Sequence, residues 1–394
     1  MKLIDRIISA AGAVGFSDGM LRAILPLLAA TVTLEPAAVA GVTVFFSLPW
    51  LIVSIPFGPI VDRYDPVLLM RLINLSRFVG IGLLLGAVTL GGEGLPLLYV
   101  GAFVLGSAET LYEMCAQVIV PRYVDKENLA KKNGHLFGVT SSLGGFIGPA
   151  VGGLLVGLAA GWAVSVSALG YVVGVLILFS VPTTPSESRP QRPRFLPQVK
   201  EGFAYLKEDR SLLSLAIIGG GATVCWYAWT AIFVLAVVDP TLLGLDPSAY
   251  GIFLAVMAAG SVTGSFLIGP ARKAISMRVL LILSLTGWAI WFIAAGVTSN
   301  IYLIGAALFI GGLSGVTWNV LTITLRQSTV PQELLGRVTA VYRTITRGGR
   351  PLGALLGGII ATTFSLQSAF IALGIATALL VLPLALVLRH TETD

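Results

Sequence analysis

Residues 278–297 read RVLLILSLTGWAIWFIAAGV, a run in which only the first side chain carries a charge. An α-helix rises about 1.5 Å per residue, so a segment of this length extends about 30 Å, the thickness of the hydrocarbon core of a bilayer. A run this long and this apolar therefore predicts a helix that crosses a membrane.

Stretches of the same character recur along the whole chain, each bounded by charge, proline or glycine. Most of them exceed the roughly 20 residues that a helix needs to span the hydrocarbon core. The sequence thus predicts an all-α membrane protein with twelve transmembrane helices. The predicted spans are 8–33, 37–60, 67–90, 95–120, 134–158, 162–182, 211–238, 248–270, 278–297, 301–325, 338–362 and 366–388.

The composition of the chain supports the same class. Of the 394 residues, 56% are apolar and 11% are charged, whereas soluble domains carry about 25% charged residues. Two cysteines, Cys115 and Cys225, lie inside apolar stretches, and the two histidines, His135 and His390, are far apart. We therefore expect no disulfide, no metal site, no cofactor and no catalytic triad, and the absence of a phosphate-binding glycine loop argues against an ATP-driven enzyme.

Most basic residues lie at one set of helix ends. The opposite loops carry Glu35, Glu93, Asp239 and Asp246 and no lysine or arginine. By the positive-inside rule, both termini are predicted to be cytoplasmic, with the chain in the inner membrane. The net charge of +6 is then a signal of topology, and it indicates no nucleic-acid partner.

The longest loop, from Pro182 to Arg210, separates six predicted helices from the following six. After Pro182 it combines four more prolines with basic residues and ends in an amphipathic segment. This pattern predicts an N-terminal bundle at 1–182, a cytoplasmic linker at 183–210 and a C-terminal bundle at 211–394.

The two halves also share sequence markers, which predict pseudo-symmetric six-helix bundles. Repeated halves of this kind are typical of transporters that work by alternating access and bind substrate where the halves meet. The first marker is Val124-x-x-Glu127-x-Leu129-x-Lys131 against Val330-x-x-Glu333-x-Leu335-x-Arg337, and the second is Gly148-Pro149-Ala150-Val151-Gly152-Gly153 against Gly353-Ala354-Leu355-Leu356-Gly357-Gly358.

The loop at 58–65, Gly-Pro-Ile-Val-Asp-Arg-Tyr-Asp, is similar to the G-x-x-x-D-R signature of the major facilitator superfamily. More narrowly, the chain resembles the drug- and siderophore-exporting branch that includes macrolide-efflux and enterobactin-exporter proteins. The resemblance implies the major facilitator fold and export across nearly the whole chain. The pieces that carry it are Gly106-Ser107-Ala108-Glu109-Thr110-Leu111, Gly148-Pro149 with Gly152-Gly153, Glu201-Gly202-Phe203-x-Tyr205-Leu206, and Gly336-Arg337-Val338 through Arg343 to Pro351-Leu352-Gly353.

Three acidic residues lie deep in predicted spans, where each ionisable side chain costs at least about 2.5–3.5 kcal/mol. Asp18 lies near the midplane with Arg22 one helical turn further, and Glu109 and Glu113 have the same spacing, with Arg77 in a neighbouring helix. One interpretation is a pair of structural ion pairs, Asp18–Arg22 and Glu109–Arg77. Three acids against two arginines would then leave one carboxylate unpaired, so Glu109, Glu113 and then Asp18 are the candidate proton carriers.

The resemblance places the first, fourth, seventh and tenth helices around a central cavity. Aromatic and carboxylate groups together suit amphipathic organic cations, although lipid-facing or core packing is the alternative for each aromatic residue. The candidate cavity residues are Arg22, Tyr112, Trp226, Tyr227, Trp229, Trp318 and Asn319.

Further arginines and the loop signature suggest a gate. Asp62, with Arg63 and Arg71, is predicted to hold the cytoplasmic side closed by capping the N-terminus of the eleventh helix; the alternative is an aspartate that caps its own loop. Departures from the branch pattern are Pro66 and Val67 in place of a basic pair and Asn74 in place of an aspartate. Additional positive charges in the eleventh helix, which pair with acids elsewhere or attract an anionic cargo or lipid, are Arg343, Arg347 and Arg350.

These features predict a monomeric, proton-coupled secondary transporter that exports small amphipathic, drug-like molecules. One alternative is an exporter or flippase of siderophore, anionic or lysophospholipid-like cargo, which the arginines of the eleventh helix favour. The alternative from another class is a membrane receptor or assembly protein that does not transport. The insertion cost of the midplane acids argues against that last alternative.

Overall fold

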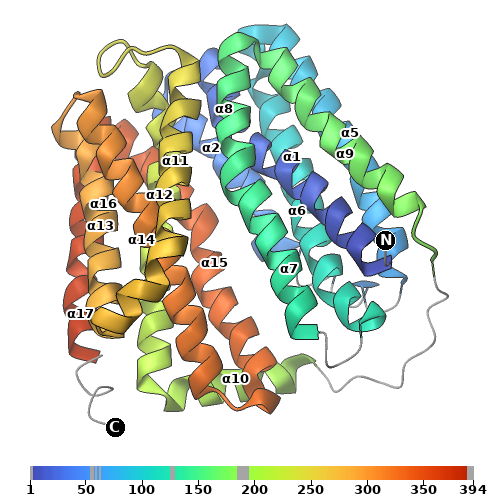
Figure 1. Ribbon diagram of the computed structural model, residues 1–394. Coiled ribbons are helices and arrows are strands. Elements are labelled where there is room, and N and C mark those ends of the chain that lie inside the picture. The colour runs from blue at the N-terminus through green and yellow to red at the C-terminus, as the bar shows by residue number, and fades with distance from the viewer. Residues whose placement is uncertain are drawn as a thin grey trace. The chain divides into compact units, whose positions relative to one another are not determined.

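The computed structural model describes residues 3–53, 57, 60–61, 64–124, 129–183 and 195–387. Within these ranges every regular element is a helix (Figure 1). The elements are α1 (Leu3–Val32), α2 (Pro36–Ser47), α3 (Pro49–Ile52), α5 (Pro66–Leu90), α6 (Leu95–Tyr123), α7 (Leu129–Ser142), α8 (Gly148–Leu158), α9 (Ala160–Phe179), α10 (Phe195–Glu208), α11 (Arg210–Val238), α12 (Pro247–Ala274), α13 (Met277–Val297), α14 (Ile301–Thr329), α15 (Gln332–Thr363), α16 (Leu366–Leu379) and α17 (Val381–Val387).

These helices follow the twelve predicted spans and confirm the all-α membrane class. In the described residues, nine stretches are long and apolar enough to cross a membrane, and one of them, Pro66–Val120, contains both α5 and most of α6. The pair α2 and α3 forms a shorter apolar segment, and four arginines lower the hydropathy of α15. The pairs α7 with α8 and α16 with α17 each fill one predicted span.

The chain forms two compact units. The first consists of Met1–Arg189 with Val237–Ala255, and the second consists of Pro190–Ala236 with Val256–Asp394. In the second unit, the amphipathic α10 packs on α15, where Glu201 forms an ion pair with Arg337 and the Tyr205 hydroxyl donates to the carbonyl of Thr329 at 3.2 Å. The finer division at 182 and 211 stays a prediction.

Close helix contacts at glycine show that the units are internal repeats. Gly148 and Gly152 of the first unit lie against the backbone of Phe16 and Met20 in α1. In the second unit, the corresponding positions of α15 lie against α11 in the same way, with Gly353 on Val224 and Gly357 on Ala228. In this register, the α11 residue that corresponds to Asp18 is Trp226.

Two further markers extend the register. Gly106 of α6 abuts the carbonyl of Phe46, and Gly312 of α14 abuts the carbonyl of Met257. Counting from these glycines, Glu109 corresponds to Gly315 and Tyr112 corresponds to Trp318.

The caps of α5 and α13 supply the last correspondence. Asp65 accepts a hydrogen bond from the amide of Leu68, and Ser276 accepts one from the amide of Val279. Arg77 is the twelfth residue after the first cap, and Trp288 is the twelfth after the second.

Gly106 provides a test of the close approach between α2 and α6. A Cβ atom at this position would overlap the Phe46 carbonyl, so we expect Gly106→Ala to destabilise the protein by roughly 1–3 kcal/mol, the usual effect of overpacking. The matched control is Gly82→Ala in α5, where a Cβ meets nothing within 4 Å and where alanine favours the helix by about 1 kcal/mol. Thermal unfolding of the purified protein compares the two variants, and an equal or higher Tm for Gly106→Ala would contradict the packing described here.

Candidate functional site

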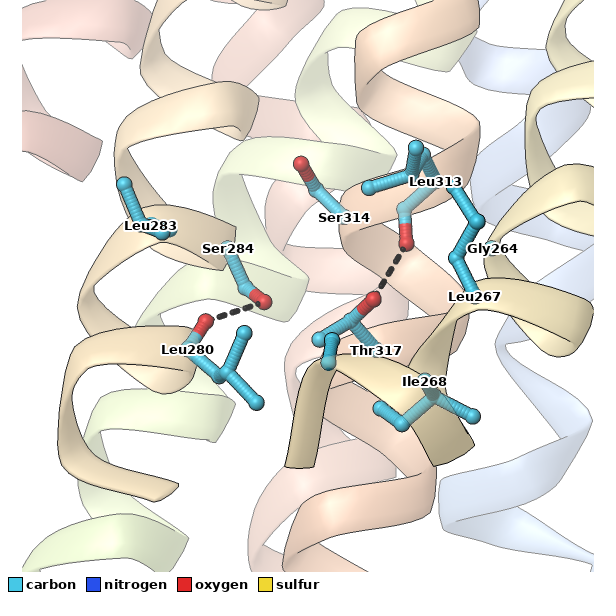
Figure 2. A pocket seen from close by; sticks show the side chains of 10 residues that line it. Gly264, Leu267, Ile268, Leu280, Leu283, Ser284, Leu313, Ser314 and Thr317 are labelled. Atoms are coloured by element: carbon cyan, nitrogen blue, oxygen red, sulfur yellow. Dashed lines mark hydrogen bonds between the residues drawn. The ribbon is translucent and has the colours of Figure 1, made fainter. Parts of the chain in front are cut away.

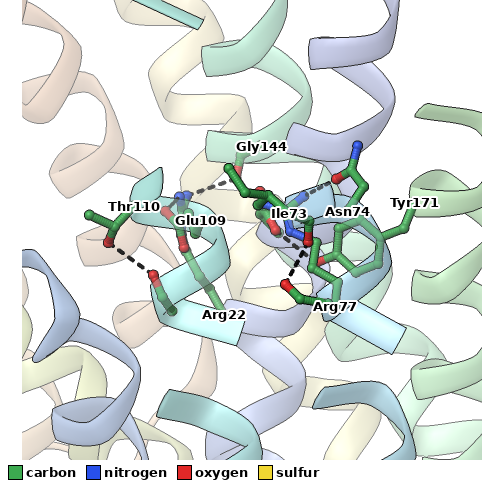
Figure 3. Close-up of polar contacts among 11 residues, drawn as sticks. Arg22, Ile73, Asn74, Arg77, Glu109, Thr110, Gly144 and Tyr171 are labelled. Atoms are coloured by element: carbon green, nitrogen blue, oxygen red, sulfur yellow. Dashed lines mark hydrogen bonds and ion pairs between the residues drawn. The ribbon is translucent and has the colours of Figure 1, made fainter. Parts of the chain in front are cut away.

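A buried polar cluster joins α1, α5 and α9 in the first unit (Figure 3). Asp18 accepts two hydrogen bonds, one from Arg77 Nη2 at 3.0 Å and one from the Tyr171 hydroxyl at 2.7 Å. Arg77 Nη1 also donates to the side-chain oxygen of Asn74 at 3.1 Å. The carboxylate and the guanidinium thus compensate each other in a region with no bulk water.

Arg77 is enclosed on both faces. Its guanidinium carbon lies 5.0 Å from the ring centroid of Tyr112 and 4.6 Å from that of Tyr171, and the residue has no exposed surface. Cation–π contacts strengthen when the cation is desolvated. Removing either partner of such a buried pair typically costs about 3–5 kcal/mol because the remaining charge is left uncompensated.

Arg22 forms a second connection, between α1 and two other segments. It makes an ion pair with Glu109 of α6, and its Nη1 donates to the carbonyl of Gly144 at 3.3 Å. The Glu109 residue is 8% exposed, whereas the Arg22 side chain is 40% exposed. This pair therefore lies closer to accessible surface than the Asp18–Arg77 pair.

The Gly144 carbonyl is available because the helix changes its hydrogen-bond pattern there. A π-helical turn covers Leu143–Ile147, and the amide of Gly148 donates to Leu143 instead of to Gly144. The next residue, Pro149, has no amide hydrogen to offer. The break in the helix at Gly148-Pro149 therefore leaves a carbonyl for Arg22.

The structure corrects the predicted ion pairs. Asp18 pairs with Arg77, and Glu109 pairs with Arg22, so the partners are exchanged relative to the prediction. The reason is that both oxygens of Asp18 are occupied by donors from other helices, which leaves Arg22 to reach α6. Glu113 also has an interaction of its own, so the expectation of one unpaired carboxylate is wrong.

At the corresponding positions of the second unit stand three tryptophans. The ring centroids of Trp226 and Trp288 are 5.7 Å apart, and those of Trp288 and Trp318 are 5.9 Å apart. In the first unit, the corresponding residues are Asp18, Arg77 and Tyr112. The same three positions therefore carry ionic chemistry in one repeat and aromatic chemistry in the other.

Trp229 is a core residue, which corrects its predicted place in the cavity wall. It is 1% exposed, and its ring lies 4.0 Å from that of Phe233 and 4.7 Å from that of Trp291. Depth along a helix does not reveal which face a side chain occupies, and the Trp229 ring lies among Phe233, Trp291 and Phe292. Asn319 is exposed.

The arginines of α15 are half-buried, and each is engaged in a contact. Arg350 lies over the ring of Tyr227, with its guanidinium carbon 5.3 Å from the centroid. The roles of Arg343 and Arg347 toward an anionic cargo stay predictions.

Of the three predicted gate residues, Asp62 and Arg63 lie outside the described residues. Arg71 donates to the carbonyl of Leu178 at 2.8 Å and to that of Val181 at 2.5 Å, so it caps the end of α9. A gating role for Arg71 stays a prediction beside this capping role.

Sequence reasoning missed Tyr171 and Trp288, which complete the ionic and the aromatic clusters. Each is the twelfth residue after its helix's N-cap, Ala159 for Tyr171 and Ser276 for Trp288. A comparison of the two halves from cap to cap pairs Trp288 with Arg77 and would have found Trp288, whereas it pairs Tyr171 with Thr377 and gives no such signal.

An apolar cavity of about 170 Å³ lies between α12, α13 and α14 in the second unit (Figure 2). Three hydroxyl residues line it, Ser284, Ser314 and Thr317. Ser284 donates to the carbonyl of Leu280 at 2.8 Å, and Thr317 donates to the carbonyl of Leu313 at 2.9 Å. The lining residues Leu267 and Leu283 are half exposed. Among the described residues, no charged residue lines the cavity.

Comparisons with known proteins agree on one class. A family model described as a transmembrane secretion effector matches residues 8–393. The enterobactin exporter of Citrobacter koseri is 28% identical over 322 residues, which cover 79% of this chain and 74% of the relative. The enterobactin exporter of Escherichia coli O127:H6 is 29% identical over the same shares.

Solved structures show the fold. A bacterial homologue of the human lysosomal transporter Spinster superposes with a TM-score of 0.75 at 14% identity, covering 100% of this chain and 97% of that chain. The nucleoside transporter NupG superposes with a TM-score of 0.74 at 12% identity, covering 99% and 100%. Both support the twelve-helix arrangement of two repeats that the sequence predicts.

The Tyr171 hydroxyl is expected to stabilise the buried carboxylate. Tyr171→Phe leaves Asp18 one donor short, and losing a partner of a buried charged group costs roughly 1–3 kcal/mol. We expect a lower Tm for the purified protein. The control is Tyr302→Phe, at a position that is 81% exposed, and an unchanged Tm in both variants would contradict the role given to Tyr171.

The contact between Arg22 and Gly144 can be tested by a double-mutant cycle. Pro149→Ala restores an amide that competes for the Gly144 carbonyl, so Arg22→Gln should cost less stability in that background than alone. We expect a coupling energy of at least about 0.5 kcal/mol, as for residues that share a partner. Arg22→Gln combined with Pro270→Ala in α12 is the control pair and should be additive. Additivity in both pairs would show that Arg22 does not depend on the helix break.

Proposed function

Because the chain belongs to the transmembrane secretion effector family of the major facilitator superfamily, we propose that it exports small amphipathic, aromatic molecules across the inner membrane in exchange for protons. The observation that carries this proposal is the difference between the two repeats. Equivalent positions hold the Asp18–Arg77 cluster in one unit and the Trp226–Trp288–Trp318 cluster in the other. We assign ion coupling to the first unit and cargo binding to the second, in a monomer with cytoplasmic termini.

Glu109 is the best candidate for the proton carrier. Its only hydrogen-bond donor among the described side chains is Arg22, whose own side chain is 40% exposed. Asp18, by contrast, is held by two donors, Arg77 and Tyr171, neither of which has any exposed surface. A proton on Glu109 would neutralise one ion pair, whereas a proton on Asp18 would leave Arg77 buried without a counter-charge.

Protonation at Glu109 also has a mechanical consequence. Arg22 would lose its ion pair with Glu109 and would keep its hydrogen bond to the Gly144 carbonyl at the break between α7 and α8. The break is the part of the first unit where the regular helix pattern already fails, and such π-helical turns are common at functional sites. We propose that proton binding acts on the bend of this helix through Arg22.

The arrangement of charges favours neutral or anionic aromatic cargo over organic cations. A cargo of amphipathic organic cations would require carboxylates and aromatic rings to lie together. The carboxylates instead pair with arginines in the first unit, while the aromatic cluster belongs to a unit with no Asp or Glu from 247 to 332. The relatives are named enterobactin exporters, which supports a siderophore-like cargo for this chain.

A transport assay separates the remaining possibilities. Purified protein is reconstituted in vesicles that contain a pH-sensitive dye, and enterobactin or the cationic dye ethidium is added. We expect enterobactin to drive proton movement in the wild type, and we expect Glu109→Gln to abolish that movement while cargo binding persists. Glu113→Gln tests the second candidate carrier, and Glu93→Gln, in an exposed turn, is the control.

Three results would overturn parts of the proposal. Cargo movement in the wild type without any proton movement would remove proton coupling. Stable binding without movement of cargo or protons would indicate a receptor. Proton movement with ethidium but not with enterobactin would restore the drug-like cationic cargo.

A further inference from the structure

We infer that one face of α14 is the cargo-binding face of the second unit, and that Arg326 on this face recognises an anionic group on an aromatic cargo. The inference rests on the proposed function and names the chemistry of its cargo. The face consists of Gly315, Trp318, Thr322 and Arg326. These positions are three or four residues apart, a spacing that places side chains along one side of a helix.

Arg326 is a buried cation whose guanidinium makes no hydrogen bond within the described residues. The residue is 5% exposed, and its guanidinium carbon lies 4.4 Å from the ring centroid of Tyr342 in α15. Its Nε is buried and has no acceptor. The part of the chain that the structure describes gives this guanidinium a ring to lie against but neither a carboxylate nor a carbonyl.

The other fully or nearly buried arginine shows what a compensated cation looks like in this protein. The Nε of Arg77 is also buried without an acceptor, but Arg77 has a carboxylate, an amide oxygen and two aromatic rings around it. Arg326 has one ring, and Tyr342 uses its own hydroxyl to donate to the carbonyl of Leu215 at 3.4 Å. A buried cation is unfavourable without an anionic partner. The described part of the chain supplies none to Arg326, so we assign that role to the cargo.

The position of Arg326 in the last turn of α14 supplies an ordinary reason for a positive charge. Cations near a helix C-terminus interact favourably with the helix dipole, and basic residues belong at cytoplasmic ends. Both effects need only a charge near the surface. Neither explains why the guanidinium is buried against a ring with vacant donors, and a lysine at 326 would satisfy both.

The aromatic part of the site lies further along the same face. A Cβ atom at Gly315 would lie 3.7 Å from the ring of Trp226 and 3.6 Å from the indole nitrogen of Trp288. The glycine therefore leaves room beside two tryptophans, at the position where the first unit carries Glu109. Gly315 and Arg326 are eleven residues apart, or about 16 Å along the helix. An aromatic molecule with an acidic group matches a face that offers rings at one end and a free guanidinium at the other.

The probes are 2-naphthoate and its neutral isostere 2-naphthamide, titrated by calorimetry into full-length protein in detergent. We expect the wild type to bind naphthoate about tenfold or more tightly than the amide, the effect of one charge-assisted hydrogen bond. Arg326→Gln should remove that preference and leave the affinity for the amide unchanged. Arg326→Lys keeps the charge at the helix end and should lose most of the preference, because a lysine lacks the planar set of donors.

Gly315 provides the independent arm. Gly315→Leu fills the space beside the tryptophans and should weaken both probes equally, whereas Gly315→Ala, whose Cβ makes only ordinary contacts, is the matched control. This arm needs no change at the buried arginine, so it holds even if Arg326→Gln does not fold.

The outcomes separate this inference from the proposed function. Equal binding of the two probes by the wild type, or an unchanged preference in Arg326→Gln, overturns the role of Arg326. Full binding by Gly315→Leu overturns the aromatic part of the site. A wild type that shows the preference for naphthoate but moves no protons with any cargo contradicts the proposed antiport and leaves the anion site standing.

Discussion

The compensation of Arg77 constrains the whole first unit. A guanidinium with no exposed surface requires a counter-charge, and Asp18 provides it from α1 while Tyr171 orients the same carboxylate from α9. Three helices that are distant in sequence are thereby fixed at one point in a medium where an uncompensated charge is very costly. This contact holds the three helices together. The junction of Arg22, Glu109 and Gly144 lies closer to accessible surface, and we propose that movement within the unit occurs there.

The two repeats share a backbone plan and differ in the chemistry placed on it. Gly106 and Gly312 make the same close contact, and so do Gly152 and Gly357. Backbone packing at these glycines sets the distance between helices, and it leaves the facing side chains free to differ. One repeat could then acquire ionisable groups and the other aromatic rings without disturbing the fold.

Much of this was predictable from the sequence, because hydropathy and charge placement act along one helix at a time. The twelve spans and the repeat markers follow from such local patterns. The partners of Asp18 and Glu109 did not follow, because the i, i+4 spacing describes neighbours on one helix, and the donors came from other helices. The predicted place of Trp229 in the cavity wall was wrong for a related reason, since the depth of a residue along a helix does not tell which face of the helix is buried. The Gly148-Pro149 motif is visible in the sequence. The Gly144 carbonyl that it leaves without an amide donor depends on a π-helical turn that no residue pattern specifies.

Arg22 explains how a proton and a helix bend can be parts of one event. An alternating transporter needs an element with two arrangements whose balance depends on the bound ion. The helix break supplies an orphaned carbonyl, Glu109 supplies a titratable anion, and a single guanidinium holds both. A proton on Glu109 would remove its ion pair with the Arg22 guanidinium. The contact between Arg22 and the Gly144 carbonyl would then change as well. In the proposed mechanism, the buried pair between Asp18 of α1 and Arg77 of α5 keeps the rest of α1 in place while this change occurs, so the free energy of protonation would act on the helix break rather than on the whole unit.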